Sequence, residues 1–352
     1  MSKFLTLIRR DISDNRGALI ITPLVIAAIL LTVTILASLT GNARFGFDPK
    51  DFSNTTEQAV NQVKAEIEVN GGTATVTRGV NGQVRVTGPD GQSKSIDEMI
   101  DPAQKASIAT ILPVGTAIAS TLPLAIAAIA ILFVLAGGLH DERKDRTILF
   151  WKSMPVTDLQ TASAKVISVV GGGFGIAFAI VLVLHLAITL IAVLTLGKVG
   201  VTGVDLGAVL INATKMWIVM LMGLLVYIGW ALPVYGWTTM VSAWAPKMPF
   251  IAAFAPLVVL PLVYMAVAFQ NNEDDAILQA LWDPLGRLIG EPVFAGVKDA
   301  LELNTRDTAT LPINELLVHL SKSLTQPAFW IGILVAGAFI YAASEIRRRR
   351  AL

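Results

Sequence analysis

The residues with the clearest capacity for chemistry or binding form a polar island between two long apolar runs. The island extends from His140 to Lys165. It contains five basic residues: Arg143, Lys144, Arg146, Lys152 and Lys165. Basic loops between spans favour the cytoplasmic side of a membrane. An apolar patch at residues 148–151 follows the first charges. Because apolar side chains at an aqueous boundary usually meet a partner or lipid, the sequence predicts a docking loop here.

The usual signatures of catalysis and metal binding are absent from the sequence. The chain has no cysteine, which excludes a disulfide framework, a thiol nucleophile and a cysteine-ligated metal. The histidines at positions 140, 185 and 319 show no metal-ligand spacing. No phosphate-binding G-x-x-x-x-G-K-[ST] loop, H-E-x-x-H or G-x-S-x-G occurs. We therefore expect no catalytic residue, metal site or cofactor bound by this chain itself.

The composition is that of a membrane protein. Of 352 residues, 54% are hydrophobic and 15% are charged. The formal net charge is +1, so the overall charge suggests neither nucleic acid nor a strongly acidic substrate as a partner.

The apolar runs predict an all-α polytopic fold with six transmembrane helices, an N-terminal interfacial helix and a small external α+β insert. With both termini inside, the predicted order is an interfacial helix (1–17), first span (18–39), external insert (40–105), second span (106–139), cytoplasmic loop (140–165), third span (166–196), fourth span (206–243), fifth span (250–269), external region with short helices (270–326), sixth span (327–344) and basic tail (345–352). The four arginines at residues 347–350 fit a cytoplasmic stop.

The second apolar run is longer than a membrane is thick. Residues 106–139 carry no charge and would form about 50 Å of helix, against a hydrocarbon core of about 30 Å. This span is therefore expected to tilt, to kink at Pro113 or Pro123, or to project beyond the membrane. Ahead of it, Asp101 and Pro102 predict a helix start.

The insert has its own local signals. Residues 53–69 have a helical spacing of apolar residues, and Asn81-Gly82 predicts a hairpin between TATVTRGV and QVRVTG. That hairpin register would place Arg78 opposite Arg85, an unfavourable like-charge pair. In the second external region, Asp283-Pro284 and Leu311-Pro312 predict helix starts.

Inside the predicted spans, polar features are few. The GGGFG run at residues 171–175 favours close helix packing, although glycines could also line a pathway. His185 is expected to be a hydrogen-bonded interior group rather than a proton carrier. None of the six apolar runs contains Asp or Glu, which argues against ion-coupled secondary transport.

The segment ERKDRTILFWKSMPVTD, from Glu142 to Asp158, followed by Lys165, resembles the coupling segment of permeases of export-type ATP-binding-cassette (ABC) transporters, in the type 2 permease superfamily. The shared pattern is Glu-Arg, a polar turn, Thr with a bulky apolar run, Ser-x-Pro, and a lysine at the next span. The six-span order, the N-terminal surface helix and the external helices after the fifth span are similar as well. The two long external regions depart from the family pattern.

The resemblance implies a permease that uses a separate ATPase subunit, which would bind ATP and Mg²⁺. Residues 148–152 would insert into a cleft of that ATPase, with Glu142 and Arg143 pairing at its edge. The implied docking residues are Glu142, Arg143, Ile148, Leu149, Phe150, Trp151, Lys152, Pro155 and Lys165.

The same resemblance implies a dimeric assembly with a second permease copy or paralogue, in a bacterial cytoplasmic (inner) membrane with both termini cytoplasmic. A lipid-like, amphipathic or peptide cargo would move outward, and membrane lipids but no nucleic acid are expected as further partners. Two alternatives stay open: a secondary transporter, and a membrane-anchored accessory protein whose external insert binds a partner.

Overall fold

The computed structural model describes residues 3–40, 75–78, 84–87, 93–147, 156–198, 200–268, 283, 286–287 and 313–349. Within that part, five helical stretches are long and apolar enough to cross a membrane: Gly17–Thr40, Gln104–Lys144, Asp158–Lys198, Leu206–Trp244 and Pro327–Arg349. The predicted helical, membrane-embedded, multi-pass character is confirmed. The predicted fifth span corresponds to helix α11, Pro249–Ala268, whose apolar stretch Pro249–Tyr264 is shorter than the other five.

The N-terminal helix and the first span form a nearly continuous helical stretch, which is the first of three long rods. Helix α1 covers Lys3–Asp14, a π-helical turn covers Gly17–Ile21, and α2 covers Thr22–Thr40. The predicted amphipathic helix is present, and Leu7 is buried on its inner face while Leu5 is exposed. Helix α1 packs on the start of the third long rod.

The second long rod, which the sequence predicted to tilt, to kink or to project beyond the membrane, is divided into two helices. Helix α5, Pro102–Ser120, begins with a capping box between Asp101 and Gln104, and α6 covers Leu122–Lys144. The break falls at Thr121, which places Pro123 in the first turn of α6, where its missing N–H removes no helical hydrogen bond.

The third long rod contains the glycine run. Helix α8, Asp158–Val166, continues through a π-helical turn, Ile167–Gly172, into α9, Gly173–Lys198. A methyl group on Gly172 would lie 2.7 Å from Ile12 of α1. On Gly173 it would lie 3.1 Å from Leu19 and Ile131. These two glycines therefore permit close helix packing, as the small-residue reading predicted.

His185 of α9 is a satisfied interior group. Its Nε2 lies 2.9 Å from the carbonyl oxygen of Pro113, and Trp217 Nε1 donates to its Nδ1 over 2.8 Å. The indole N–H can only donate, so this arrangement corresponds to a neutral ring protonated at Nε2. The histidine thus ties the third long rod to α5 and α10.

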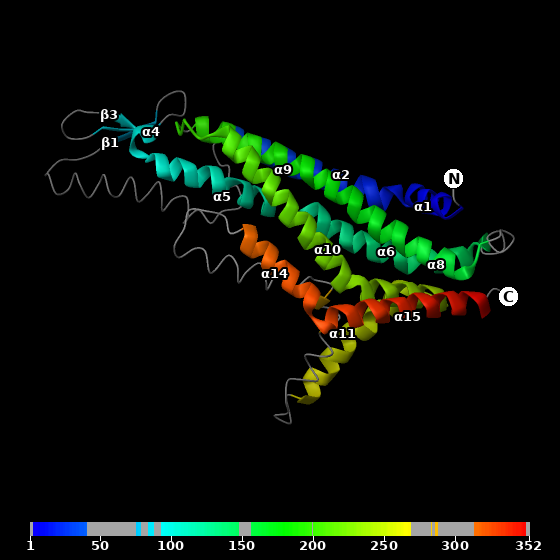
Figure 1. Ribbon diagram of the computed structural model, residues 1–352. Helices are drawn as coiled ribbons and strands as arrows, with labels where there is room; N and C mark the ends of the chain where they lie inside the picture. Colours follow the sequence, from blue (N-terminus) through cyan, green and yellow to red (C-terminus); the bar gives the residue numbers. More distant parts are fainter. Residues whose placement is uncertain are drawn as a thin grey trace.

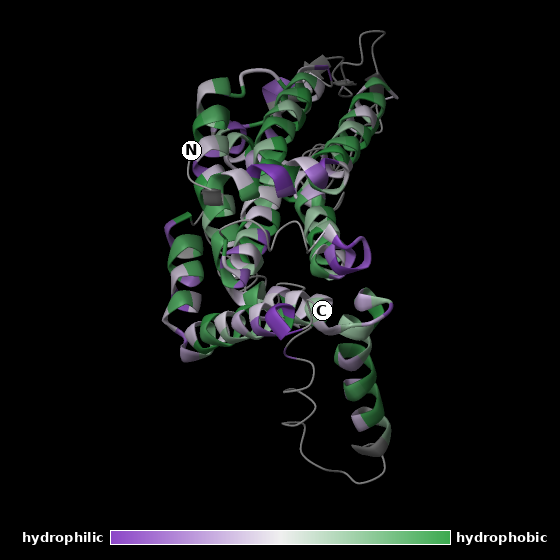
Figure 2. Cartoon of the chain, turned by 90° about the vertical axis from the view of Figure 1, so that its right-hand side faces the viewer, coloured by the Kyte–Doolittle hydropathy of each residue, from purple (hydrophilic) through white to green (hydrophobic). Residues whose placement is uncertain are grey.

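Helix α10, Leu206–Trp244, is the longest single α-helix among the described residues. Two helices pack side by side with α10: α14, Ile313–Thr325, along its first half, and α15, Pro327–Arg349, along its second half (Figure 1). The backbones of α10 and α15 approach closely at Gly236, where an added methyl group would lie 3.0 Å from the Ala336 carbonyl oxygen. Helix α11 instead leans away from the other helices at its far end (Figures 1 and 2).

A small antiparallel sheet joins strands β1 (Thr75–Arg78), β2 (Val84–Thr87) and β3 (Ser93–Ser95) in that order, with the short helix α4 (Ile96–Met99) after it. The predicted hairpin is present, but its predicted register is wrong by one residue. Arg78 pairs with Val84 and Arg85 pairs with Thr77, so the expected opposition of two arginines does not occur. The predicted helix at 53–69 lies outside the described residues.

The sheet region is fastened to the helices through Asp97. Its carboxylate accepts from Lys105 Nζ at 2.7 Å and from the backbone and hydroxyl of Thr202, also at 2.7 Å. The hydrogen bonds from Lys105 and Thr202 lower the pKa of Asp97 below its ordinary value.

At the opposite end of the rods lie both chain termini and the ends of α6 and α8 (Figure 1). Viewed from that end, hydrophilic residues gather around largely hydrophobic helices (Figure 2).

Candidate functional site

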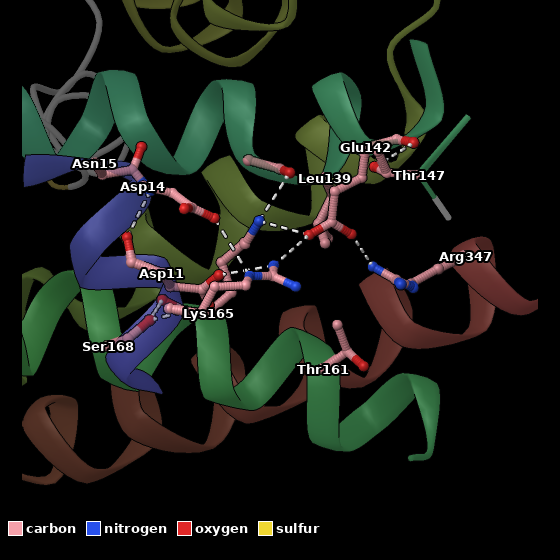
Figure 3. A network of polar contacts seen from close by, with 12 residues as sticks. Asp11, Asp14, Asn15, Leu139, Glu142, Thr147, Thr161, Lys165, Ser168 and Arg347 are labelled. Atoms are coloured by element: carbon pink, nitrogen blue, oxygen red, sulfur yellow. Dashed lines mark hydrogen bonds and ion pairs between the residues drawn. The ribbon is translucent and has the colours of Figure 1, made fainter. Parts of the chain in front are cut away.

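A buried carboxylate, Glu142, stands at the centre of a polar cluster at the end of the bundle that carries both termini (Figure 3). Its Oε1 lies 2.8 Å from Lys165 Nζ and 3.6 Å from Arg10 Nη2, while Oε2 accepts a hydrogen bond from Arg347 Nη1. The four side chains come from α6, α8, α1 and α15 in turn. One carboxylate therefore joins four helices that are distant in sequence.

Local sequence features place these groups. Helix α8 begins at Asp158 behind a Thr157–Gln160 capping box, which fixes the direction of the rod that carries Lys165. Gly138 makes room for the lysine stem, because a methyl group there would lie 2.8 Å from Lys165 Cδ. Lys165 Nζ also donates to the Gly138 carbonyl oxygen at 2.9 Å. The close approach of α6 and α8 thus depends on glycine at position 138.

The C-terminal helix enters the cluster through Arg347. Helix α15 continues to Arg349, beyond the predicted end of the span at residue 344. Arg347 is 3% exposed, and its Nε donates to Asp158 Oδ1 at 2.9 Å. Arg348, by contrast, is exposed and pairs with Glu345. Arg347, which the sequence analysis placed in the basic tail at residues 345–352, is thus an interior residue.

Helix α1 adds a second carboxylate beside the first. Asp11 is buried and accepts from Arg10 Nη2 at 3.0 Å and from Ser168 Oγ at 3.3 Å. Burial raises the pKa of Asp11 above its ordinary value, and the charges of Lys165 and Arg10 offset part of that rise. The exposed Asp14 lies 3.3 Å from Arg10 Nε.

The charges of the cluster are closely balanced. Buried ions are costly unless they are paired and hydrogen-bonded, and removing one partner leaves an uncompensated charge. Here three cations face three buried or partly buried carboxylates: Arg10, Lys165 and Arg347 against Asp11, Glu142 and Asp158. Helices α1 and α8 each supply one charge of either sign, whereas α6 supplies Glu142 and α15 supplies Arg347. Separating α6 or α15 from the others would therefore leave a charge without its counterion.

A neighbouring set of contacts ties α6 to α10. Arg143 Nη2 donates to the carbonyl oxygens of Ser242 and Ala245 at 3.0 and 2.8 Å. His140 Nδ1 lies 3.1 Å from the same Ala245 oxygen. Helix α6 then ends near Arg146, which has a left-handed backbone (φ 55°) typical of the residue after a helix. The end of α6 is therefore held firmly against the end of α10.

The structure brings together two of the sequence-predicted docking residues, Glu142 and Lys165, as an ion pair within the chain. Arg143 lies on the same helix end but contacts the end of α10. The remaining members lie outside the described residues: Ile148, Leu149, Phe150, Trp151, Lys152 and Pro155. The pairing of Glu142 and Arg143 with an ATPase stays a prediction, and both side chains have partners in this chain.

Sequence reasoning missed several members of the cluster: Arg10, Asp11, Asp158 and Arg347. One signal was available for Asp11, an acidic residue four positions after Leu7 and therefore on the same face of an amphipathic helix. For Arg347 no signal existed, because it is one of four consecutive arginines. Which of these arginines is buried depends on how α15 packs against α8.

Among the described residues, no group of three or more acidic or histidine side chains could hold a metal ion. Comparisons with models of known protein families, with curated proteins and with solved structures find no match for this chain. The likeness to export-type permeases therefore stands on the residues quoted from the sequence.

Proposed function

We propose that this chain is the transmembrane permease subunit of an ATP-driven exporter of the ABC class, worked by a separate ATPase subunit. The observation that carries the proposal is the Glu142 cluster. It binds together the two long rods that border residues 148–155, and it adds the N-terminal and C-terminal helices to the same unit. A force applied to that loop would therefore move four helices together.

The mechanism follows from rigidity. Helix α6 continues into α5 with one break at Thr121, and α8 continues into α9 without leaving helical geometry. ATP-driven closure of an ATPase that grips residues 148–152 would swing both rods, because their ends are joined through Glu142 and Lys165. The swing would shift the population toward a state open outward or sideways into lipid.

The proposal includes the membrane topology and the assembly of the chain. Helix α11 crosses the membrane in addition to the five long stretches, which brings the number of crossings to six. An even number of crossings places both termini on the same side, the cytoplasmic side of a bacterial inner membrane. The small sheet then lies outside the cell. Basic residues near the ends of α1, α6 and α15 agree with that orientation under the positive-inside tendency. Two permeases and two ATPases would complete the assembly, with a lipid-like, amphipathic or peptide cargo passing between the permeases.

The test compares two variants that lack aromatic side chains at different places in the chain. Replacing Phe150 and Trp151 by Ala should abolish copurification of a nucleotide-binding subunit, detected by photolabelling with an azido-ATP analogue in membranes from the native host. Trp330→Ala is the matched control, because Trp330 is 58% exposed near the other end of α15. Both variants should insert normally. Unchanged photolabelled partner in the Phe150/Trp151 variant would overturn the docking assignment.

The two rival functions make different predictions in sealed vesicles. A secondary transporter would lose transport when the ion gradient is dissipated and would keep it when ATP is withdrawn. An accessory protein would move no substrate under either energy source. No described observation favours either rival over the exporter.

A further inference from the structure

An apolar cavity lies on the side of the helix bundle, away from the Glu142 cluster. It has a volume of about 450 Å³ and lies between α10, α11 and α15. Its walls are almost wholly apolar and include Trp237 of α10, Leu257 and Leu260 of α11, and Val335 and Phe339 of α15. The volume and lining suit part of a lipid-sized ligand.

The cavity also has a pair of opposite charges, Asp283 and Arg287. Arg287 Nε lies 2.6 Å from Asp283 Oδ2, and its guanidinium carbon lies 5.0 Å from the centre of the Trp230 ring. The two side chains differ in exposure, 16% for Arg287 and 50% for Asp283. The cation is thus held against the helices, while the carboxylate faces outward beside it.

The fold makes room for this arginine at one position. A methyl group on Gly332 would lie 2.9 Å from Arg287 Nη1 and 3.2 Å from Pro233 Cγ. Arg287 Nη1 also donates to the carbonyl oxygen of Ala328, at 3.4 Å. Glycine at 332 therefore lets a charged side chain lie against the first turns of α15.

The position of the ion pair along the bundle makes it unusual. Gly332 lies about 22 Å from Arg347 along α15, at about 1.5 Å of rise per residue. A hydrocarbon core is about 30 Å thick. If Arg347 marks one boundary of the membrane, Arg287 lies within its depth, where an ionisable side chain is costly and is by default a candidate for function.

We propose that this cavity binds one membrane phospholipid with a zwitterionic headgroup. The Arg287 guanidinium donates to the headgroup phosphate, Asp283 accepts from the headgroup ammonium, and an acyl chain lies along the apolar walls toward Phe339. Paired charges at one place in an otherwise apolar cavity match this ligand in both charge and polarity. Helix α11 supplies an outer wall whose Leu260 is 55% exposed, so the chain can enter from the bilayer.

The experiment uses the purified full chain in lipid nanodiscs with no nucleotide and no ATPase. The probes are phosphatidylethanolamine and phosphatidylglycerol, each carrying a photoactivatable diazirine on one acyl chain, with crosslinked peptides located by mass spectrometry. Phosphatidylethanolamine should label the lining peptides of α10, α11 and α15 about tenfold more than phosphatidylglycerol, which has no headgroup cation. Arg287→Gln should lower labelling by both lipids, because both carry the phosphate to which its guanidinium donates, whereas Asp283→Asn should reduce the preference to near equality while chain labelling persists.

Two cavity-filling variants separate binding from general lipid contact. Val335→Trp and, from the opposite wall, Leu260→Trp should each remove labelling of the lining peptides. Val183→Trp is the matched control, since Val183 is 71% exposed on α9 and should leave that labelling unchanged. Labelling spread evenly over exposed helices, equal labelling by both lipids in the unmodified chain, or crosslinks between two copies of the chain at these peptides would each overturn the proposal. Because the assay needs no ATPase, its failure would leave the exporter proposal intact.

Discussion

The Glu142 cluster and the Asp283–Arg287 pair place charge among apolar helices in opposite ways. In the cluster, four helices share the charges and close around them, so Glu142 and Arg347 are 8% and 3% exposed. At the cavity, the two charges come from residues one helical turn apart and border open apolar space. The first arrangement joins helices to each other. The second leaves a site that a ligand can complete.

This difference predicts which region governs stability. Breaking a buried ion pair by removing one partner costs about 3–5 kcal/mol, because the other charge is left without compensation. A pair with a half-exposed member contributes about 0–1 kcal/mol. Removing a charge of the cluster should therefore lower the free energy of unfolding more than removing a charge of the cavity pair, which should affect ligand preference instead.

The largest effect is expected for Glu142→Ala. With the central carboxylate removed, Lys165 and Arg347 lose their shared partner, and the free energy of unfolding should fall by about 3–5 kcal/mol. Unfolding by SDS titration in mixed micelles measures it. Glu345→Ala is the control, because Glu345 pairs with the exposed Arg348 and Arg349, and its loss should lower the free energy of unfolding far less. Equal losses in the two variants would remove the distinction between the cluster and the surface.

A smaller effect on stability is expected for Asp283→Asn. The side chain is 50% exposed, so the loss should stay within about 0–1 kcal/mol in the same SDS titration. The preference for phosphatidylethanolamine should nevertheless decline in the crosslinking assay, because the acceptor for its ammonium group is gone. A loss of stability as large as that of Glu142→Ala would instead make Asp283 a structural residue, and the contrast between the two regions would fail.

The smallest effect is expected for Asp11→Asn, and it depends on pH. Because the folded-state pKa of Asp11 is raised, the folded chain binds a proton at this site more tightly than the unfolded chain. The ionised carboxylate is therefore unfavourable at neutral pH, and that penalty disappears as the pH falls through the raised value. The variant should be slightly more stable than the unmodified chain at pH 7, and the difference should shrink toward the ordinary pKa of 3.8. A difference that grows on acidification would show the opposite shift.

The sequence predicted the long helices well, because uncharged runs of this length have few alternatives to a membrane helix. The start of α5 at Pro102, the bend before Pro123 and the packing role of Gly172 and Gly173 follow from local rules. The hairpin register did not follow, since a shift of one residue is decided by pairing beyond the turn dipeptide.

The candidate site was predictable only in part. Glu142 and Lys165 were singled out by the resemblance, yet nothing in their spacing indicated that they pair with each other inside the chain. The burial of Arg347 and the approach of Arg287 to α15 depend on how distant helices cross. Such contacts carry no periodic signal, so a single sequence cannot predict them.

The central claim is that work done by a separate ATPase enters this chain at residues 148–152 and moves its long helices. The chain has no cysteine, so a spin label can be attached at the exposed Val183→Cys on α9, once in each of the two permeases of the proposed assembly. In the copurified complex, trapping with ATP and vanadate should change the distance between the labels, and Phe150→Ala with Trp151→Ala should abolish that change. A distance that is the same with and without nucleotide, or one that still responds in the double variant, would contradict the account.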